Sequence, residues 1–243
     1  MTFEEIRQLK QRKHREAAGC YLVEGEHLIL ELEKAARTRP ALGDATLYVS
    51  PSRADWRSPL KTQVISTSQM ARLSDTREPQ GLLAVVPMLP AAAPVAGERL
   101  VYLHEVQDPG NLGTLLRTLA WFGGFRCLLS PDSVDPYNPK AVRASMGAIF
   151  HLPIETGVAL DAFAARCRQI GCLHLEGEPI SSAAFADCDG LLFGGEARGL
   201  PEAWTSLPHA RAFTITGCGA IESLNLASAA AMCAWELNRS AKK

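Results

Sequence analysis

Apolar residues in the first 86 positions switch between helical and strand spacing, which predicts a small α/β unit. Residues 2–18 and 26–37 carry apolar side chains at the spacing of one helical face, and residues 67–73 read as a shorter helix. The pattern also predicts four short strands, at residues 20–23, 46–49, 63–65 and 82–86.

A proline-rich stretch follows this unit. Pro87, Pro90 and Pro94 are separated mainly by alanines, which is typical of a semi-rigid linker. We therefore expect a linker at about residues 88–98, with one domain at 1–90 and a second at 98–243.

The second domain alternates strands with helices, which indicates an α/β fold with a mostly parallel sheet. Its strands are expected at residues 100–106, 126–129, 152–154, 172–175, 190–193 and 213–216. Ligands of such sheets bind beyond the carboxyl ends of the strands. Three loops qualify for this role, at residues 107–111, 194–200 and 216–223.

Composition narrows the class of protein. Hydrophobic residues make up 47% of the chain and charged residues 21%, with a net charge of −1, as in globular proteins. No apolar run approaches a membrane span of ~20 residues, and no signal pattern opens the chain, so we expect a cytoplasmic protein without a membrane partner. The seven cysteines are scattered without Cys-x-x-Cys, and the histidines lack ligand spacing, so no metal site is expected.

Cations gather near the N-terminus. The densest run lies between Arg7 and Arg15, where we select Arg12, Lys13 and Arg15 as candidate RNA contacts. Such a run is either a solvated helix face or a contact to a phosphate backbone.

Two common types of site lack a residue that they require. Gly217-x-Gly219 sits between a strand and a helix, as in a dinucleotide fingerprint, but Glu222 replaces the third glycine and no later strand follows. A nucleophile elbow around Ser145 would need a glycine where Arg143 stands. An NAD-dependent oxidoreductase is therefore disfavoured.

A constellation of three motifs remains. Asn111-x-Gly113-x-x-x-Arg117, residues 194–200 (GGEARGL) and residues 222–225 (ESLN) follow one another on strand-to-helix loops. In order and spacing they resemble the signature motifs of the SpoU (TrmH-like) RNA ribose 2′-O-methyltransferases. Residues 140–153 resemble the segment that this family carries between its first two motifs. The N-terminal part is similar to the substrate-binding domain, related to ribosomal protein L30e, that many members carry.

The resemblance implies a fold and a cofactor. Family members have a parallel sheet whose last helix forms a deep trefoil knot, and they work as homodimers. They bind S-adenosylmethionine in the knot, largely through backbone groups. By position this role falls on Gly194, Ile215 and Leu224, with Gly195 and Asn225 nearby.

The implied reaction is methyl transfer to a ribose 2′-hydroxyl, with Arg117 as the principal catalytic residue. A guanidinium is a donor with a high pKa. Two roles for Arg117 therefore stay open. Either a substrate phosphate and neighbouring groups perturb the guanidinium so that it can take the hydroxyl proton, or Arg117 holds the phosphate and orients the hydroxyl. Asn111 would fix the arginine or the ribose, while Glu196 and Ser223 would order the loops, with Asn225 beside them.

Several alternatives stay open. Ser223 and Asn225 are also ordinary helix caps, and Arg143 is either an RNA contact or part of a structural ion pair. Gly195, Ala197 and Thr216 depart from the family motifs and affect donor contacts. Ribosomal RNA is the favoured substrate, transfer RNA is the alternative, and a catalytically silent RNA-binding protein is the competing class.

Overall fold

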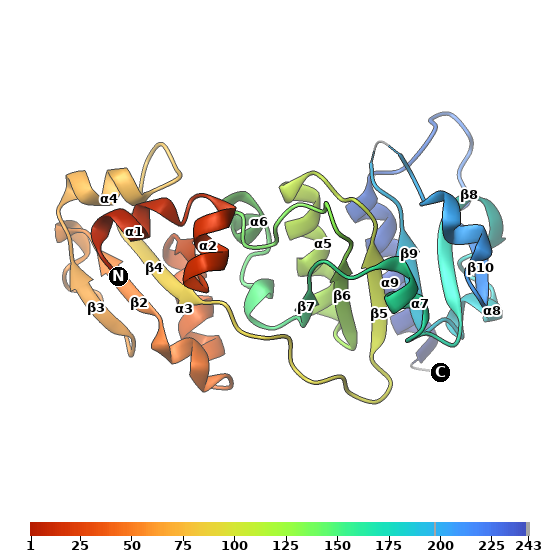
Figure 1. Cartoon of the computed structure of the whole chain (residues 1–243), viewed down its shortest axis with the longest axis horizontal. Helices are drawn as coiled ribbons and strands as arrows, with labels where there is room; N and C mark the ends of the chain where they lie inside the picture. Colours follow the sequence, from red (N-terminus) through yellow and green to blue (C-terminus); the bar gives the residue numbers. More distant parts are fainter. Residues whose placement is uncertain (197, 242–243) are drawn as a thin grey trace. The chain divides into compact units, whose positions relative to one another are not determined.

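The computed structural model describes residues 1–196 and 198–241, and the chain divides into two compact units (Figure 1). The first unit comprises Met1–Pro90 together with Asp135–His151. The second comprises Ala91–Val134 and the chain from Leu152 onward. A segment from the middle of the sequence thus folds with the N-terminal residues, which the order of elements along the chain does not indicate. The linker at about 88–98 stays a prediction.

The first unit is built on a four-stranded sheet in the order β1-β4-β2-β3. β4 is antiparallel to β1 and β2, and β2 is parallel to β3. The strands are β1 (Cys20–Glu24), β2 (Thr46–Val49), β3 (Lys61–Val64) and β4 (Leu82–Pro87). The helices of the N-terminal part are α1 (Phe3–Gln8), α2 (Arg12–Ala18), α3 (Glu26–Ala36) and α4 (Thr67–Leu73), with short 3-10 turns η1 (Pro40–Asp44) and η2 (Pro51–Arg53).

The single helix expected over residues 2–18 is two helices. Thr2 caps α1 through a capping box with Glu5, and α1 ends at the C-cap residue Leu9. The guanidinium of Arg15 donates to the carbonyls of Leu9 (2.8 Å) and Lys10 (2.9 Å). Arg15 therefore satisfies backbone acceptors that the break between the helices leaves without helical partners.

The segment Asp135–His151 completes the first unit. It contains α6 (Pro139–Ala144) and η3 (Ala148–Phe150), which pack against β1 and α3 respectively. Arg15 forms an ion pair with Asp135 and is only 2% exposed. Tyr137 contacts Tyr21 with ring centroids 4.7 Å apart.

The second unit confirms the α/β class and the mostly parallel sheet. Its six strands lie in the order β10-β8-β9-β5-β6-β7, and every neighbouring pair is parallel. They are β5 (Arg99–Leu103), β6 (Phe125–Leu129), β7 (Ile154–Glu155), β8 (Ile170–Pro179), β9 (Gly190–Phe193) and β10 (Ala210–Thr214).

The helices of this unit are α5 (Pro109–Phe122), α7 (Leu160–Ala164), α8 (Ala183–Ala186) and α9 (Leu226–Ala241), with a 3-10 turn η4 (Glu202–Ser206). α5 and α9 pack against each other (Figure 1). The threading of α9 through a knot stays a prediction. No helix within the described ranges is long and apolar enough to cross a membrane.

Candidate active site

Three loops emerge from one edge of the second unit's sheet. They follow β5, β9 and β10. The second and third motifs lie on the loops after β9 and β10, and the first motif lies in α5, which begins directly after the loop that follows β5. Because the strands are parallel, their carboxyl ends face the same edge, where ligands of such sheets bind. The tertiary structure therefore brings together stretches that lie about a hundred positions apart in sequence.

Asn111 is the centre of a hydrogen-bond network that joins the three motifs. Its Nδ2 donates to Glu196 Oε1 (3.0 Å), and its Oδ1 accepts from Asn225 Nδ2 (2.9 Å). Asn225 in turn accepts at Oδ1 from the backbone N–H of Ala227 (2.9 Å) and of Ser228 (3.3 Å). Asn225 therefore has two roles, since it caps α9 and also orients Asn111.

The start of α5 leaves the Asn111 side chain available for this network. Asp108, not Asn111, is the N-cap, and its Oδ1 accepts from the Asn111 N–H (2.8 Å). Pro109 occupies the first turn, where its missing N–H costs nothing. The Asn111 side chain is thus not used for capping.

Glu196 fixes the second motif against the first. Its carboxylate accepts from Asn111 and from the backbone N–H of Gln107 (3.2 Å) and of Asp108 (3.4 Å). Partial burial acts to raise the pKa of Glu196, but the hydrogen bonds from Asn111 and the loop backbone outweigh it and lower the pKa. Glu196 is therefore a poor proton acceptor and a good positioning group.

Two glycines of the second motif stand where no side chain fits. A Cβ at Gly194 would lie 2.0 Å from the carbonyl carbon of Gly199. A Cβ at Gly195 would lie 2.9 Å from the Glu105 oxygen and 3.0 Å from the His104 oxygen. The departure from the family motif at Gly195 thus has a local reason, because backbone closes over this position. Ala197 lies outside the described residues.

The third motif lies on an exposed loop. Ile215 is half-buried, while residues 216–225 are exposed, with Leu224 at 44% and Ile221 at 74%. Ser223 makes no hydrogen bond to any residue that the structure describes. The network therefore includes Asn225 but not Ser223.

Arg117 is exposed and makes no hydrogen bond or ion pair with the described part of the chain. It follows Asn111 by six positions on α5. At 100° and 1.5 Å per residue it lies about 120° around the helix and about 9 Å further along its axis. Arg117 consequently does not face the network of its own chain.

Two family models match the sequence. The model described as the SpoU rRNA Methylase family matches residues 98–235, more than half of the chain. The chain belongs to this family. A second model, the MRM3-like substrate binding domain, matches residues 2–84.

Relatives of known name agree with the family. The chain is 27% identical to the 23S rRNA (guanosine(2553)-2′-O)-methyltransferase RlmP of Bacillus subtilis, over 95% of this chain and 93% of that protein. It is 30% identical to the 23S rRNA (uridine(2479)-2′-O)-methyltransferase of Streptomyces viridochromogenes, over 95% and 86%. It is also similar to the crystal structure of an AdoMet-bound rRNA methyltransferase from Sinorhizobium meliloti, with a TM-score of 0.82, 27% identity and coverage of 98% and 94%.

The site fits the methyl donor of a SpoU methylase. Within residues 216–224 no backbone N–H or C=O is hydrogen-bonded to another described residue, so these groups can serve a ligand. Exposed Leu224 and Ile221 offer apolar contact to a ligand bound there. Among the described residues, no group of three His, Cys, Asp or Glu side chains could hold a metal ion.

The four candidate RNA contacts lie in the first unit in different settings. Lys13 and Arg12 are exposed, and Arg12 pairs with Glu16 (2.7 Å). Arg15 is buried and committed to Asp135 and two carbonyls, so we leave it out of the RNA surface. Arg143 pairs with Asp75.

Asp108 and Glu105 are site residues that the sequence reasoning passed over. The Asp-Pro pair at 108–109 is a helix-start signal that would have identified Asp108 as the cap. Glu105 has a positive φ of 49° and accepts from Arg198 (3.2 Å), which ties the end of β5 to the second motif. No sequence signal marks this pair, because positive φ is usually associated with glycine.

Proposed function

We propose that this protein transfers a methyl group from S-adenosylmethionine to a ribose 2′-hydroxyl of ribosomal RNA. The Asn111–Glu196–Asn225 network carries the proposal, because it joins one side chain from each of the three motifs at the sheet edge. The names of the relatives support ribosomal RNA over transfer RNA as the substrate. We also propose that the protein methylates this RNA in the cytoplasm.

The donor would be held by the backbone around Gly194, Gly195, Ile215 and Leu224. When bound there, S-adenosylmethionine would supply an activated methyl group to the ribose 2′-oxygen, leaving S-adenosylhomocysteine and a proton that passes to solvent. Asn111 offers its amide to the ribose, held in place by Glu196 and Asn225. Glu196 stays ionised, which keeps it an acceptor of those hydrogen bonds.

We assign to Arg117 the holding of the substrate phosphate and the orientation of the 2′-hydroxyl. A guanidinium binds phosphate with two parallel N–H donors and stays protonated at neutral pH. Because its own chain provides no partner among the described residues, the side chain is available for RNA.

The proposed assembly is a homodimer in which Arg117 serves the site of the other subunit. Arg117 lies about 120° around α5 from Asn111, which supports an arrangement in which Arg117 serves another copy's site. α5 and α9 pack against each other and expose Trp121 (84%), Trp235 (54%) and Met232 (42%), and large apolar side chains exposed on neighbouring helices support an interaction surface. A second copy packed on these helices would cover that surface and supply the arginine.

Calorimetric titration with S-adenosylmethionine tests the donor, with NADH as the control ligand. Saturable binding of the first and none of the second is expected. A map of 2′-O-methyl sites in total RNA, from cells with and without this gene, then identifies the target. No binding of the donor, or an identical methylation map, would contradict the proposal.

A further inference from the structure

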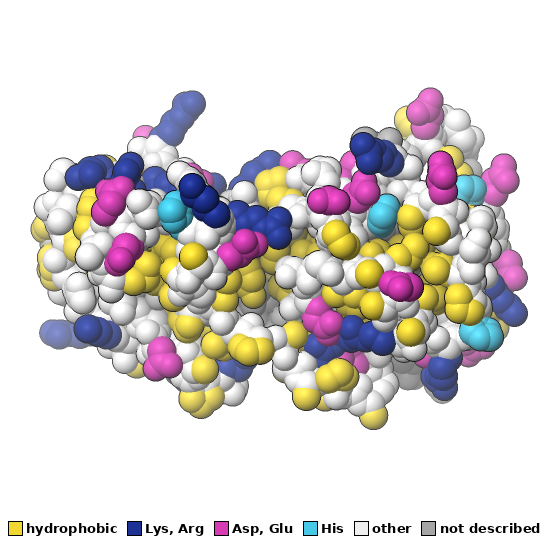
Figure 2. Space-filling model, in the orientation of Figure 1, with side chains coloured by type: hydrophobic (Ala, Val, Ile, Leu, Met, Phe, Trp, Pro, Cys, Tyr) yellow, Lys and Arg dark blue, Asp and Glu magenta, His cyan; other side chains and the backbone are white. Residues whose placement is uncertain are grey.

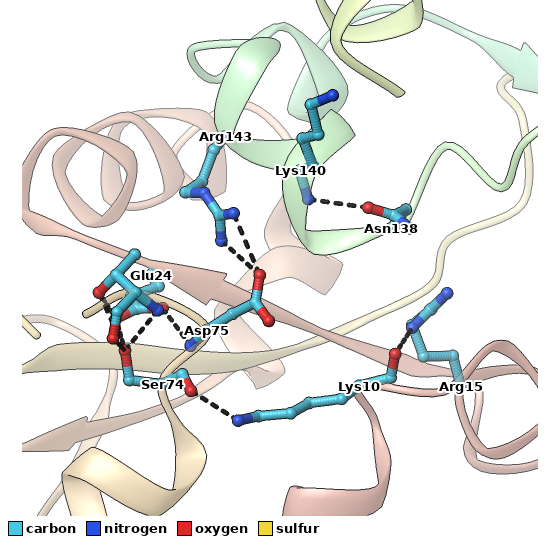
Figure 3. A network of polar contacts seen from close by, with 9 residues as sticks. Lys10, Arg15, Glu24, Ser74, Asp75, Asn138, Lys140 and Arg143 are labelled. Atoms are coloured by element: carbon cyan, nitrogen blue, oxygen red, sulfur yellow. Dashed lines mark hydrogen bonds and ion pairs between the residues drawn. The ribbon is translucent and has the colours of Figure 1, made fainter. Parts of the chain in front are cut away.

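Asp75 and Arg143 form an ion pair on the first unit that joins the N-terminal residues to the segment Asp135–His151 (Figure 3). The family model for substrate binding ends at residue 84, so Arg143 lies outside it in sequence but inside the same folded unit. The surface of this unit is therefore composite, and α6 contributes to it.

The turn that carries Asp75 is held from two sides. The Glu24 carboxylate accepts from the Ser74 hydroxyl, the Thr76 hydroxyl (2.9 Å) and the Asp75 N–H (3.0 Å). Lys10 donates from its ammonium group to the carbonyl of Ser74 on the same turn (Figure 3). Asp75 is thus presented to α6 from a fixed backbone.

The ion pair itself is weakly held. Both terminal nitrogens of Arg143 donate to one oxygen, Asp75 Oδ2, each at 3.1 Å. The two side chains are 33% and 43% exposed, and water screens the attraction within a pair that is this exposed. The remaining donors of Arg143 have no hydrogen bond to any residue within the described ranges. A phosphate, with two oxygens for the guanidinium fork, is a stronger partner than a single carboxylate oxygen.

Other cations lie on the same part of the unit. Lys140 precedes Arg143 by three positions on α6, which places both on one side of the helix, and Lys140 is exposed. Lys and Arg side chains lie over the region of α2 and α6 on the face shown in Figure 2. This charge pattern fits an RNA backbone.

We propose that Arg143 is a phosphate contact for structured RNA, and that Asp75 holds its guanidinium in place until the phosphate replaces the carboxylate. The inference rests on the proposed function and deepens it, because it locates a substrate contact outside the matched substrate-binding domain. It also assigns Asp75 two opposing effects on RNA. Asp75 orients Arg143, but it occupies the donors and repels the phosphate.

Separate substitutions of Arg143 and Asp75 distinguish a phosphate contact from a purely structural ion pair. Arg143→Gln should weaken binding of labelled, fragmented bacterial ribosomal RNA up to about tenfold at 0.1 M salt, and lower the salt slope by about 1. Asp75→Asn should tighten binding by severalfold. A purely structural pair would give changes of the same sign, because either substitution breaks the same contact.

The matched control is the pair Arg53–Glu26 on the same unit, at 3.0 Å and with exposures of 39% and 45%. Arg53→Gln and Glu26→Gln should not change RNA binding in opposite directions. Arg143→Lys keeps the positive charge and should retain the salt slope of RNA binding. A lower slope in Arg143→Gln alone is then due to the lost charge and not to a folding defect.

Parallel titration of every variant with S-adenosylmethionine keeps the two proposals distinguishable. Donor binding without the opposite RNA responses overturns the Arg143 site and leaves the enzyme proposal standing. Opposite RNA responses without donor binding support the Arg143 site and overturn the enzyme proposal.

Discussion

Arg15, Arg117 and Arg143 are three arginines whose settings in sequence look alike, and the structure gives each a different role. Arg15 is buried against Asp135, Arg143 shares a half-exposed ion pair, and Arg117 has no partner among the described residues. Burial and partners decide whether a guanidinium is structural or available to a ligand. Neither is readable from the residue type.

Arg117→Ala should lower the rate of methyl transfer by about a hundredfold or more. The substitution removes a charged contact that is made at the reacting hydroxyl. Donor binding should change by less than about twofold, since Arg117 does not touch the proposed donor loops. Transfer is measured with radiolabelled donor and binding by calorimetry. Arg211→Ala, at another exposed arginine of the same unit, is the control and should keep its activity. Wild-type transfer by Arg117→Ala would remove Arg117 from the mechanism.

At the scale of elements, α5 and α9 begin with residues that serve the site as well as the helix. Asp108 caps α5, which leaves the Asn111 side chain for Glu196 and Asn225. Asn225 caps α9 and donates to Asn111 through the other end of the same amide. The sequence allowed Asn225 to be a cap or a site residue, and the structure shows that it caps α9 and is also bonded to Asn111.

Asn225→Asp separates these two roles. The carboxylate keeps an oxygen for the N–H groups of Ala227 and Ser228, but it cannot donate to Asn111 Oδ1. The midpoint of thermal unfolding should stay near wild type, while methyl transfer falls about tenfold or more. Asn225→Ala loses the cap as well and should also lower the free energy of unfolding by about 1 kcal/mol. Full activity in Asn225→Asp would show that the Asn111–Asn225 bond is dispensable.

At the scale of the whole molecule, the first unit is assembled from two separate pieces of sequence. Met1–Pro90 and Asp135–His151 share a core in which Val142 lines the same hollow as Leu22 and Leu73. The Arg15–Asp135 ion pair joins the pieces where water is excluded. The segment between the first two family motifs therefore stabilises the N-terminal unit.

Arg15→Ala should lower the free energy of unfolding of the first unit by about 3–5 kcal/mol, because it leaves the Asp135 carboxylate and two carbonyls without their donor. Urea unfolding of the full chain, followed by the fluorescence of Trp56 in a background where Trp121, Trp204 and Trp235 are replaced by Phe, measures the loss. Lys13→Ala, two positions away and exposed, should cost less than about 0.5 kcal/mol. Equal stabilities for the two variants would mean that the buried pair contributes nothing.

Mixing two variants that are each strongly impaired tests the shared site. If Arg117 serves the other subunit, dimers formed from Arg117→Ala and Asn225→Asp contain one complete site. Random exchange should then restore about a quarter of wild-type activity. If Arg117 serves its own chain, every site lacks one residue and the mixture is no more active than the average of the two variants measured separately, which would overturn the proposed dimer arrangement.

Periodicity and motif order predicted much of this protein. The alternation of strands and helices predicted the mostly parallel sheet, because apolar spacing follows local backbone geometry. The order of Asn111–Arg117, Gly194–Leu200 and Glu222–Asn225 indicated the SpoU family, since the side-chain types at each loop are tied to the chemistry. The fold class and family are confirmed, and the knot, the dimer and the roles of the site residues stay predictions.

Only the tertiary structure decided which distant residues meet. Asn111 reaches Glu196 and Asn225, Asp75 reaches Arg143, and Arg15 reaches Asp135 across 120 positions. These pairings depend on strand order and on the return of residues 135–151 to the first unit, which no local pattern encodes. The sequence by itself therefore determined the fold class and the family, while the fold determined which polar groups are partners and which remain for a ligand.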